Sequence, residues 1–329
     1  MDHESSSDVL RRLAPGIALA ALAAAIAYPV GRVVPVVGAP VIALVLGIGA
    51  AAVRPPAERM QPGLRFTGKY VLQAAIVLLG ATFGLGEVAS VGAATLPVMV
   101  GTLAAALVVA LVGGRLLGLG DRVRALIGVG TGICGASAIA AVSGIVEATE
   151  VEIAYAVTTI FLFNLVAVAT FPALGHVFGL SQSAFGVWAG TAVNDTSSVV
   201  AAAYAYGPTA GAHAVLVKLT RTTMIVPIAA LLAARRATRT TWRSTVPWFV
   251  LWFVAAAALH TTGVLPAGVV AALQQASVGL IAAALAAIGL SSRLGDLRRA
   301  GPRPLLLGAA VWVTVAATSL LLQHASGVL

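Results

Sequence analysis

Long apolar runs of Ala, Leu and Val, separated by short polar stretches, set the pattern of this chain. A backbone in lipid must satisfy its own hydrogen bonds, so runs of roughly 17–25 apolar residues predict transmembrane helices. The alternating polarity of a transmembrane β-barrel is not seen. We therefore expect an all-α membrane protein with about eleven transmembrane helices, at residues 13–28, 39–53, 70–85, 94–116, 125–146, 153–176, 184–206, 212–234, 246–260, 268–291 and 304–323.

Composition supports a membrane location, because 60% of the 329 residues are hydrophobic and only 9% are charged. Soluble domains carry about 25% charged residues. The net charge of +9 would suit a nucleic-acid partner in a soluble protein, but here the basic residues lie between apolar runs. The expected partner is the lipid bilayer, and no nucleic acid is expected. Residues 1–12 are predicted to be a disordered cytoplasmic N-terminus, and residues 13–329 a single polytopic transmembrane domain.

The basic residues also predict an orientation. If the N-terminus is cytoplasmic, the 20 Lys and Arg residues divide into seventeen on the inside, Arg32 on the outside and two within spans. The positive-inside rule then places the N-terminus in the cytoplasm and the C-terminus in the periplasm. The outer loops are expected to be acidic or neutral, and they include Glu87, Glu147, Glu150 and Glu152.

A short internal echo suggests an inverted repeat. Residues 79–88 and 288–297 have similar Gly- and Leu-rich sequences, each is followed by a span that contains proline, and the two copies start on opposite sides of the predicted membrane. Inverted-topology repeats produce this relationship in many transporters. Chance similarity between two Gly/Leu-rich segments is the alternative.

Three charged residues fall inside predicted spans: Asp195, Lys218 and Arg221. Each costs about 2.5–3.5 kcal/mol at a helix centre on insertion scales, so such residues need partners or water and are functional by default. At 1.5 Å per residue, Asp195 and Arg221 reach similar depths, roughly 16 and 14 Å from the same face. This predicts an Asp195–Arg221 ion pair, and a purely structural pair between two helices is the alternative.

Two stretches of small and polar residues, 130–138 and 190–198, lie near mid-depth. Gly, Ser, Thr and Asn loosen helices, and broken helices expose backbone dipoles to substrates in transporters. Close helix packing through small residues is the alternative. The predicted substrate-binding residues are Cys134, Gly135, Ser137, Asn194, Asp195, Thr196, Ser197, Ser198, Lys218 and Arg221, with Asp195 also predicted to carry a coupling ion.

Other polar residues give weaker signals. Gln274, Gln275 and Ser277 could line a cavity, and Asn164 could bond a neighbouring helix. No cluster of His, Cys and carboxylate has the spacing of a metal site, so no metal or other cofactor is expected. The single cysteine excludes an intramolecular disulfide.

Three motifs resemble the sulfate exporter family of bacterial inner-membrane proteins: Gly-Ile-Cys-Gly-Ala-Ser-Ala at 132–138, Asn-Asp-Thr-Ser-Ser-Val-Val-Ala-Ala at 194–202 and Lys-Leu-Thr-Arg at 218–221. The resemblance covers nearly the whole chain. It implies membership of the superfamily of sodium/proton antiporters and bile-acid symporters, with two inverted repeats and unwound crossing helices. By that analogy the fifth and tenth spans would be the two unwound helices that cross each other. Many members of the family carry a histidine where this chain has Asn194, so proton coupling through a histidine is not expected here.

The sequence therefore predicts a secondary transporter, an exporter of a small anion such as sulfate or a sulfonate, in the bacterial inner membrane. The alternatives are an ion-coupled symporter or antiporter for another small organic solute, and a passive anion channel. A membrane enzyme that uses Cys134 and Asp195 is a further rival, but no motif for a general base accompanies Cys134, and we expect no enzymatic activity. A homo-oligomer is left open.

Overall fold

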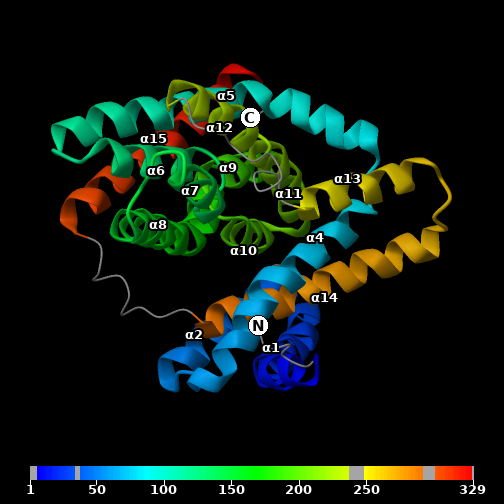
Figure 1. The fold of residues 1–329 in the computed structure, drawn as a ribbon. Coiled ribbons are helices and arrows are strands. Elements are labelled where there is room, and N and C mark those ends of the chain that lie inside the picture. Colours follow the sequence, from blue (N-terminus) through cyan, green and yellow to red (C-terminus); the bar gives the residue numbers. More distant parts are fainter. Residues whose placement is uncertain (1–5, 34–37, 237–247, 292–300, 328–329) are drawn as a thin grey trace. The chain divides into compact units, whose positions relative to one another are not determined.

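The computed structural model describes residues 6–33, 38–236, 248–291 and 301–327, and all of its regular structure within these ranges is helical (Figure 1). The chain divides into two compact units, formed by residues 1–88 with 249–294 and by residues 89–248 with 295–329. Apolar composition is nearly even along the chain, so no boundary between these units was predicted, and the single polytopic domain stays a prediction. The first helix begins at Ser6, within the segment that was predicted to be disordered.

The first unit contains α1 (Ser6–Val33), α2 (Gly38–Val53), η1 (Glu58–Met60), α3 (Gln61–Phe66), η2 (Thr67–Val71), α4 (Leu72–Gly80), α13 (Trp248–Thr261) and α14 (Ala267–Ser291). Helices α2 and α14 pack closely through paired glycines. A Cβ atom on Gly47 would lie 2.6 Å from the Ala286 carbonyl oxygen, and one on Gly289 would lie 2.5 Å from the Leu44 carbonyl oxygen. Small residues at this crossing let the two backbones approach, as is common between membrane helices.

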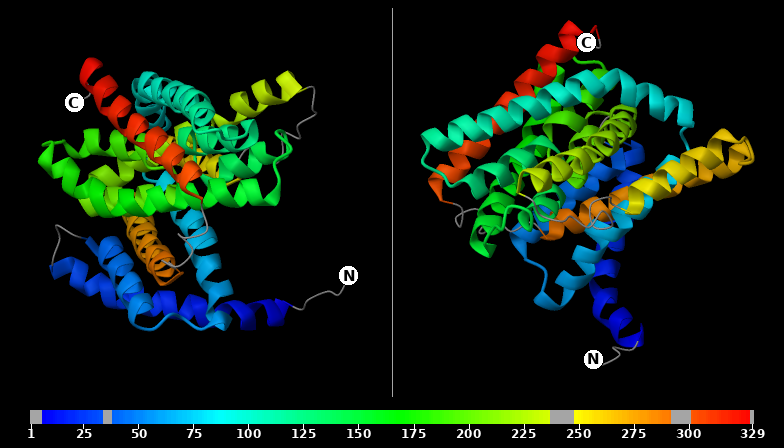
Figure 2. Two further views of the ribbon diagram at one scale, coloured as in Figure 1. Left: turned by 90° about the vertical axis from the view of Figure 1, so that its left-hand side faces the viewer. Right: turned by 45° about the horizontal axis from the view of Figure 1, so that its top comes forward.

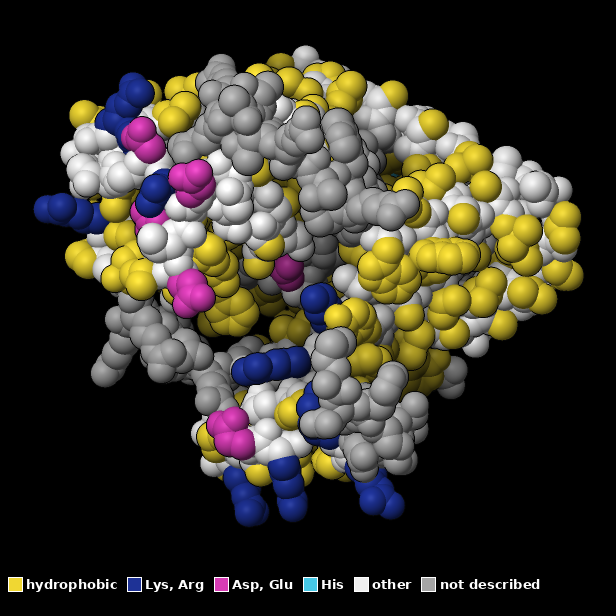
Figure 3. Space-filling view, in the orientation of Figure 1, with side chains coloured by type: hydrophobic (Ala, Val, Ile, Leu, Met, Phe, Trp, Pro, Cys, Tyr) yellow, Lys and Arg dark blue, Asp and Glu magenta, His cyan; other side chains and the backbone are white. Residues whose placement is uncertain are grey.

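One end of the first unit is basic. Gly16 of α1 lies against Gly63 of α3, so the beginning of α1 and the segment after α2 share this end. Figure 3 shows Lys and Arg side chains gathered there and hydrophobic side chains over α13. The exposed basic residues of these segments are Arg11, Arg12, Arg54, Arg59, Arg65 and Lys69.

The second unit contains most of α5 (Leu85–Leu116), then α6 (Asp121–Gly132), α7 (Ala136–Ser143), α8 (Glu150–Val177), α9 (Gln182–Ala192), α10 (Thr196–Tyr206), α11 (Pro208–Thr222), α12 (Ile225–Arg236) and α15 (Pro302–Ala325). Helix α15 packs against α6, α8 and α9, and the green helices form the body of this unit in Figure 2.

Six stretches of the described residues are long and apolar enough to cross a membrane, and two shorter apolar helices accompany them. The long stretches lie in α1, α5, α8, α11–α12, α14 and α15, and the short ones in α2 and α13. The predicted span at 70–85 is α4 with part of the preceding π-helical turn. The two remaining predicted spans, 125–146 and 184–206, are each broken in the middle.

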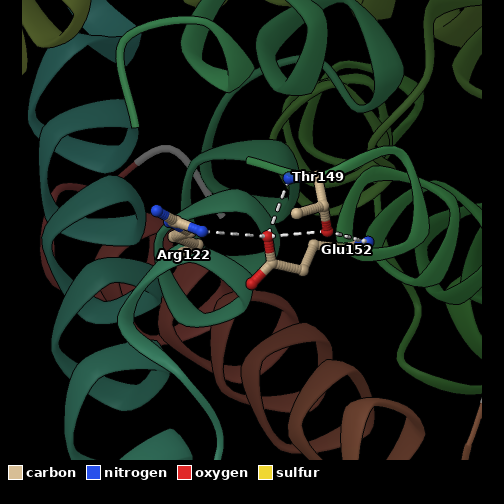
Figure 4. A network of polar contacts seen from close by, with 3 residues as sticks. All are labelled: Arg122, Thr149 and Glu152. Atoms are coloured by element: carbon tan, nitrogen blue, oxygen red, sulfur yellow. Dashed lines mark hydrogen bonds and ion pairs between the residues drawn. The ribbon is translucent and has the colours of Figure 1, made fainter. Parts of the chain in front are cut away.

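The first broken segment, α6–α7, folds back on itself as a hairpin. Arg122 at the beginning of α6 lies 3.9 Å from the carboxylate of Glu152, which follows the end of α7. Glu152 and Thr149 form a capping box at the start of α8, with the Thr149 N–H donating to Glu152 at 2.8 Å (Figure 4). Both ends of this hairpin therefore lie at one end of the unit, and the prediction that residues 125–146 form a crossing helix is wrong.

The second broken segment, α9–α10, is also a hairpin. Tyr206 at the end of α10 donates to the Leu180 carbonyl just before α9, and its ring stacks on Phe185 with centroids 3.9 Å apart. The Gln182 side chain accepts from the N–H groups of Thr209 and Ala210, which ties the start of α11 to the same place. Residues 184–206 thus return to the end from which they start, where a crossing helix was predicted.

The two hairpins enter the unit from opposite ends. Helix α8 begins beside the base of α6–α7, and at its other end His176 stacks on Tyr206 at the base of α9–α10. From Glu150 to His176 the helix rises about 39 Å, more than the roughly 30 Å of a bilayer core. The Glu147–Glu152 segment therefore belongs with Arg122, not on the opposite side as predicted. Helix α8 therefore runs in the opposite direction to the one predicted. Because two predicted crossings become hairpins, the segments after the second hairpin and the C-terminus keep their predicted sides.

The prediction that the tenth span is an unwound helix, crossing a second unwound helix, is also wrong. Helix α14 is unbroken from Ala267 to Ser291, and Ser277 donates to the Ala75 carbonyl within the first unit. The interrupted partner of the fifth predicted span is the seventh. The second copy of the sequence echo lies partly outside the described residues, so the inverted repeat stays a prediction.

Candidate functional site

The tips of the two hairpins touch in the middle of the second unit. At the first tip Gly135 has φ 69° and ψ −130°, a conformation that glycine adopts without strain. A Cβ atom there would lie 3.6 Å from both the Asp195 Cα and the Asn194 carbonyl carbon of the second tip. Each tip holds the C-terminus of one short helix and the N-terminus of the next, so four helix ends converge. Both helix breaks were predicted from the small polar residues.

Lys218 of α11 joins the two tips. Its side chain is fully buried, and Nζ donates to the Ile133 carbonyl of the first tip and to the Val193 carbonyl of the second, each at 2.9 Å. These carbonyls follow the ends of α6 and α9, where helices leave acceptors unsatisfied and the macrodipole is negative. The ammonium group thus satisfies both tips at once.

Arg221 does the same one helical turn further along. Nε and one terminal nitrogen donate to the Gly132 and Thr131 carbonyls at 2.9 Å each, and the other terminal nitrogen donates to the Thr191 carbonyl. The side chain is 1% exposed. Helix α12 continues beyond it, where Ala229 packs against Ile145 after α7. Helices α11 and α12 therefore run along both hairpins, with the two cations where the tips meet.

The predicted Asp195–Arg221 ion pair is not formed. Among the described residues, the ion pairs of the second unit are Arg122–Glu152 and Arg124–Asp121. Asp195 instead caps α10, and its carboxylate accepts from the N–H of Ser197 at 3.0 Å and from the Ser197 hydroxyl. The matching depth of the two residues stays a prediction, and the partners of the arginine are helix-end carbonyls. An apolar pattern does not reveal such acceptors.

Asn164 of α8 holds the second tip. Its Oδ1 accepts from the N–H groups of Asn194 and Asp195, at 3.0 and 3.2 Å, and the residue is 3% exposed. These two N–H groups belong to the break, where no helical partner exists for them. Asn164 was only a weak candidate in the sequence analysis, although an amide in the middle of an apolar span is itself a sign of a buried hydrogen bond. From Glu150 it lies about 21 Å along the helix and from His176 about 18 Å, so the tips are near mid-depth.

The remaining predicted residues separate into a buried and an accessible group. Cys134 is buried at the first tip, and Asn194 is buried at the second. Ser137, one residue into α7, is exposed, and residues 195–198 at the start of α10 are half-buried. The accessible polar groups therefore belong to the N-terminal ends of α7 and α10. By contrast, the weaker candidates Gln274 and Gln275 belong to the first unit.

The charges at the tips do not cancel. Lys218 and Arg221 contribute +2 and Asp195 contributes −1, which leaves a formal charge of +1. Two helix C-termini and two N-termini carry partial charges of about −0.5 and +0.5 each, which sum to zero. No group of three or more His, Cys, Asp or Glu side chains that could hold a metal occurs in the part of the chain that the structure describes.

Comparison with known proteins identifies the family. The model of the family described as Conserved hypothetical protein 698 matches residues 15–308. A UPF0324 membrane protein of Streptococcus pyogenes serotype M6 is 40% identical over 97% of this chain and 98% of its own length. A UPF0324 membrane protein of Streptococcus agalactiae serotype V is 39% identical, over 95% and 97%, and one of Clostridium tetani is 35% identical, over 97% and 99%. The chain therefore belongs to the Conserved hypothetical protein 698 family of multi-pass membrane proteins, together with these UPF0324 membrane proteins.

Proposed function

We propose that this protein is a secondary transporter of a small anion, such as sulfate or a sulfonate, that binds at the hairpin tips. The observation that carries the proposal is the meeting of two hairpins, inserted from opposite ends, at a pair of fully buried cations. In many transporters the substrate site likewise lies near mid-depth, where discontinuous helices meet.

The anion preference rests on charge and on backbone geometry. The formal charge of +1 at the tips is costly in a low-dielectric interior, and a bound monoanion would offset it. Gly135 offers no side-chain cap to α7, so the first N–H groups of this helix would be free to bind an anion. Ser137 and the hydroxyls of Thr196, Ser197 and Ser198 would bind the oxygens of the anion, and Asp195 would carry a coupling proton or cation.

The N-terminus is proposed to be cytoplasmic and the C-terminus periplasmic, in the inner membrane. The basic end of the first unit supports this orientation, because exposed arginines of α1 and of the segment after α2 share it. No enzymatic activity is proposed, since Cys134 is buried at the crowded first tip.

Purified protein in liposomes tests the function. We expect radiolabelled sulfate, phosphate or methanesulfonate to exchange against the same unlabelled anion inside, with a rate that saturates as concentration rises. Flux that rises linearly without saturation would favour the passive channel instead. Exchange of a cation or of a neutral organic solute, with none of these anions, would overturn the proposal.

A further inference from the structure

The side chain of Asn194 is buried at the second tip without any hydrogen-bond partner. It is 1% exposed, and neither Oδ1 nor Nδ2 has a partner among the residues that the structure describes. Its backbone is fixed, because its N–H donates to Asn164 and its carbonyl carbon lies against Gly135. Buried amides in native proteins are nearly always bonded, so a group that lacks both kinds of bond calls for an explanation.

Packing alone does not explain the amide. An unmade hydrogen bond at a buried polar atom costs about 1–3 kcal/mol, and Asn194 has two such atoms. Leu or Val would fill a similar volume without this cost. The chain also places the amide where the four helix ends meet, next to residues that we assign to the substrate.

The chemistry of an amide restricts what would satisfy it. Nδ2 donates and therefore needs an acceptor, whereas Oδ1 accepts and therefore needs a donor. A fully deprotonated oxyanion such as sulfate offers acceptors alone and would leave Oδ1 unsatisfied. An oxyanion that keeps a hydroxyl group offers both.

We infer that the preferred ligand is a singly charged oxyanion that retains a hydroxyl group, of the bicarbonate or dihydrogen phosphate type, and that Asn194 selects it. This inference rests on the proposed anion site and specifies its substrate class. The single charge agrees with the formal +1 at the tips. The backbone N–H groups of α7 would bind the charged oxygens, and the Asn194 amide would bind the hydroxyl.

Two matched pairs of anions test the inference by calorimetric titration of the full-length protein. Bicarbonate and nitrate are both planar monoanions with three oxygens, and only bicarbonate carries a hydrogen. Dihydrogen phosphate and methanesulfonate form a tetrahedral pair in mildly acidic buffer. We expect the hydroxyl-bearing member of each pair to bind at least about tenfold more tightly, as the penalty for one unsatisfied acceptor implies.

Asn194→Leu should reduce this preference to within about twofold, because it removes the group that distinguishes the pair. Gln323→Leu is the matched control, since Gln323 is also a fully buried amide with an unsatisfied oxygen, on α15; this variant should keep the preference. Equal binding of both members by the unchanged protein would overturn the inference and leave the anion site intact. If none of the four anions nor sulfate bound, the proposed function itself would fail.

Discussion

The guanidinium of Arg122 lies 3.9 Å from the carboxylate of Glu152, although an unbroken apolar stretch of crossing length separates them in the sequence. A helix that spanned the bilayer between them would hold their side chains about 30 Å apart. The contact therefore requires residues 125–146 to enter and leave at the same end of the unit. With the second hairpin entering from the other end, this places both tips at mid-depth.

Chemical labelling should find the two ends of each hairpin on one side. In a Cys134→Ala background, which removes the single native cysteine, Leu116→Cys and Glu147→Cys should react with an impermeant maleimide from the cytoplasmic side. Phe178→Cys and Thr209→Cys should react from the periplasmic side. Labelling of positions 116 and 147 from opposite sides would show that the segment crosses the membrane.

The sequence could predict the helices and the two breaks, but not the hairpins or the partners of Arg221. Apolar runs predict helices, and the small polar residues around Gly135 and Asn194 predict the two breaks. The direction of the chain after a break leaves no signal in hydropathy, because a hairpin and a crossing helix need the same apolar length. The partners of Arg221 are backbone carbonyls, which every residue has, so the sequence pointed to Asp195 as the only acid nearby.

Arg221 and Asp195 should act independently on stability. Arg221→Gln leaves helix-end carbonyls without their charged donor, and we expect a loss of about 2–4 kcal/mol in the free energy of unfolding. Asp195→Asn should cost less than about 1 kcal/mol, because asparagine also caps helices well. In a double-mutant cycle measured by denaturant unfolding in detergent, the coupling energy should stay below about 0.5 kcal/mol. A coupling energy of several kcal/mol would show that Asp195 and Arg221 interact directly, as the ion pair requires.

The first tip should tolerate no side chain at Gly135. Gly135→Ala forces a Cβ atom into a positive-φ conformation, at a cost of about 1–3 kcal/mol in unfolding free energy. Gly144→Ala provides the control, because Gly144 has φ −67° and open space around it. The control should be neutral or stabilising by up to about 1 kcal/mol. Equal stability of the two variants would argue against the turn at Gly135.

Asn164 should be required for the second tip. Asn164→Leu removes the acceptor of two buried N–H groups, and we expect it to destabilise the protein by about 2–4 kcal/mol. Thr170→Val on the same helix removes a hydroxyl that bonds only to the Val166 carbonyl of its own helix, and it should change stability by less than about 1 kcal/mol. Thermal unfolding of the two variants gives the comparison, and an unaffected Asn164→Leu would show that the tip does not depend on this residue.

Anion binding by Ser137→Leu tests the central claim most directly, since this change fills the accessible end of α7 with bulk and alters no charge. Ser143→Leu adds the same bulk at the far end of the same helix and serves as the control. In calorimetric titrations with sulfate, bicarbonate and dihydrogen phosphate, we expect Ser137→Leu to weaken every binding anion at least about tenfold, a loss of about 1.4 kcal/mol. Ser143→Leu should bind as the unchanged protein does. If Ser137→Leu bound these anions as tightly as the control, the hairpin tips would not be the anion site.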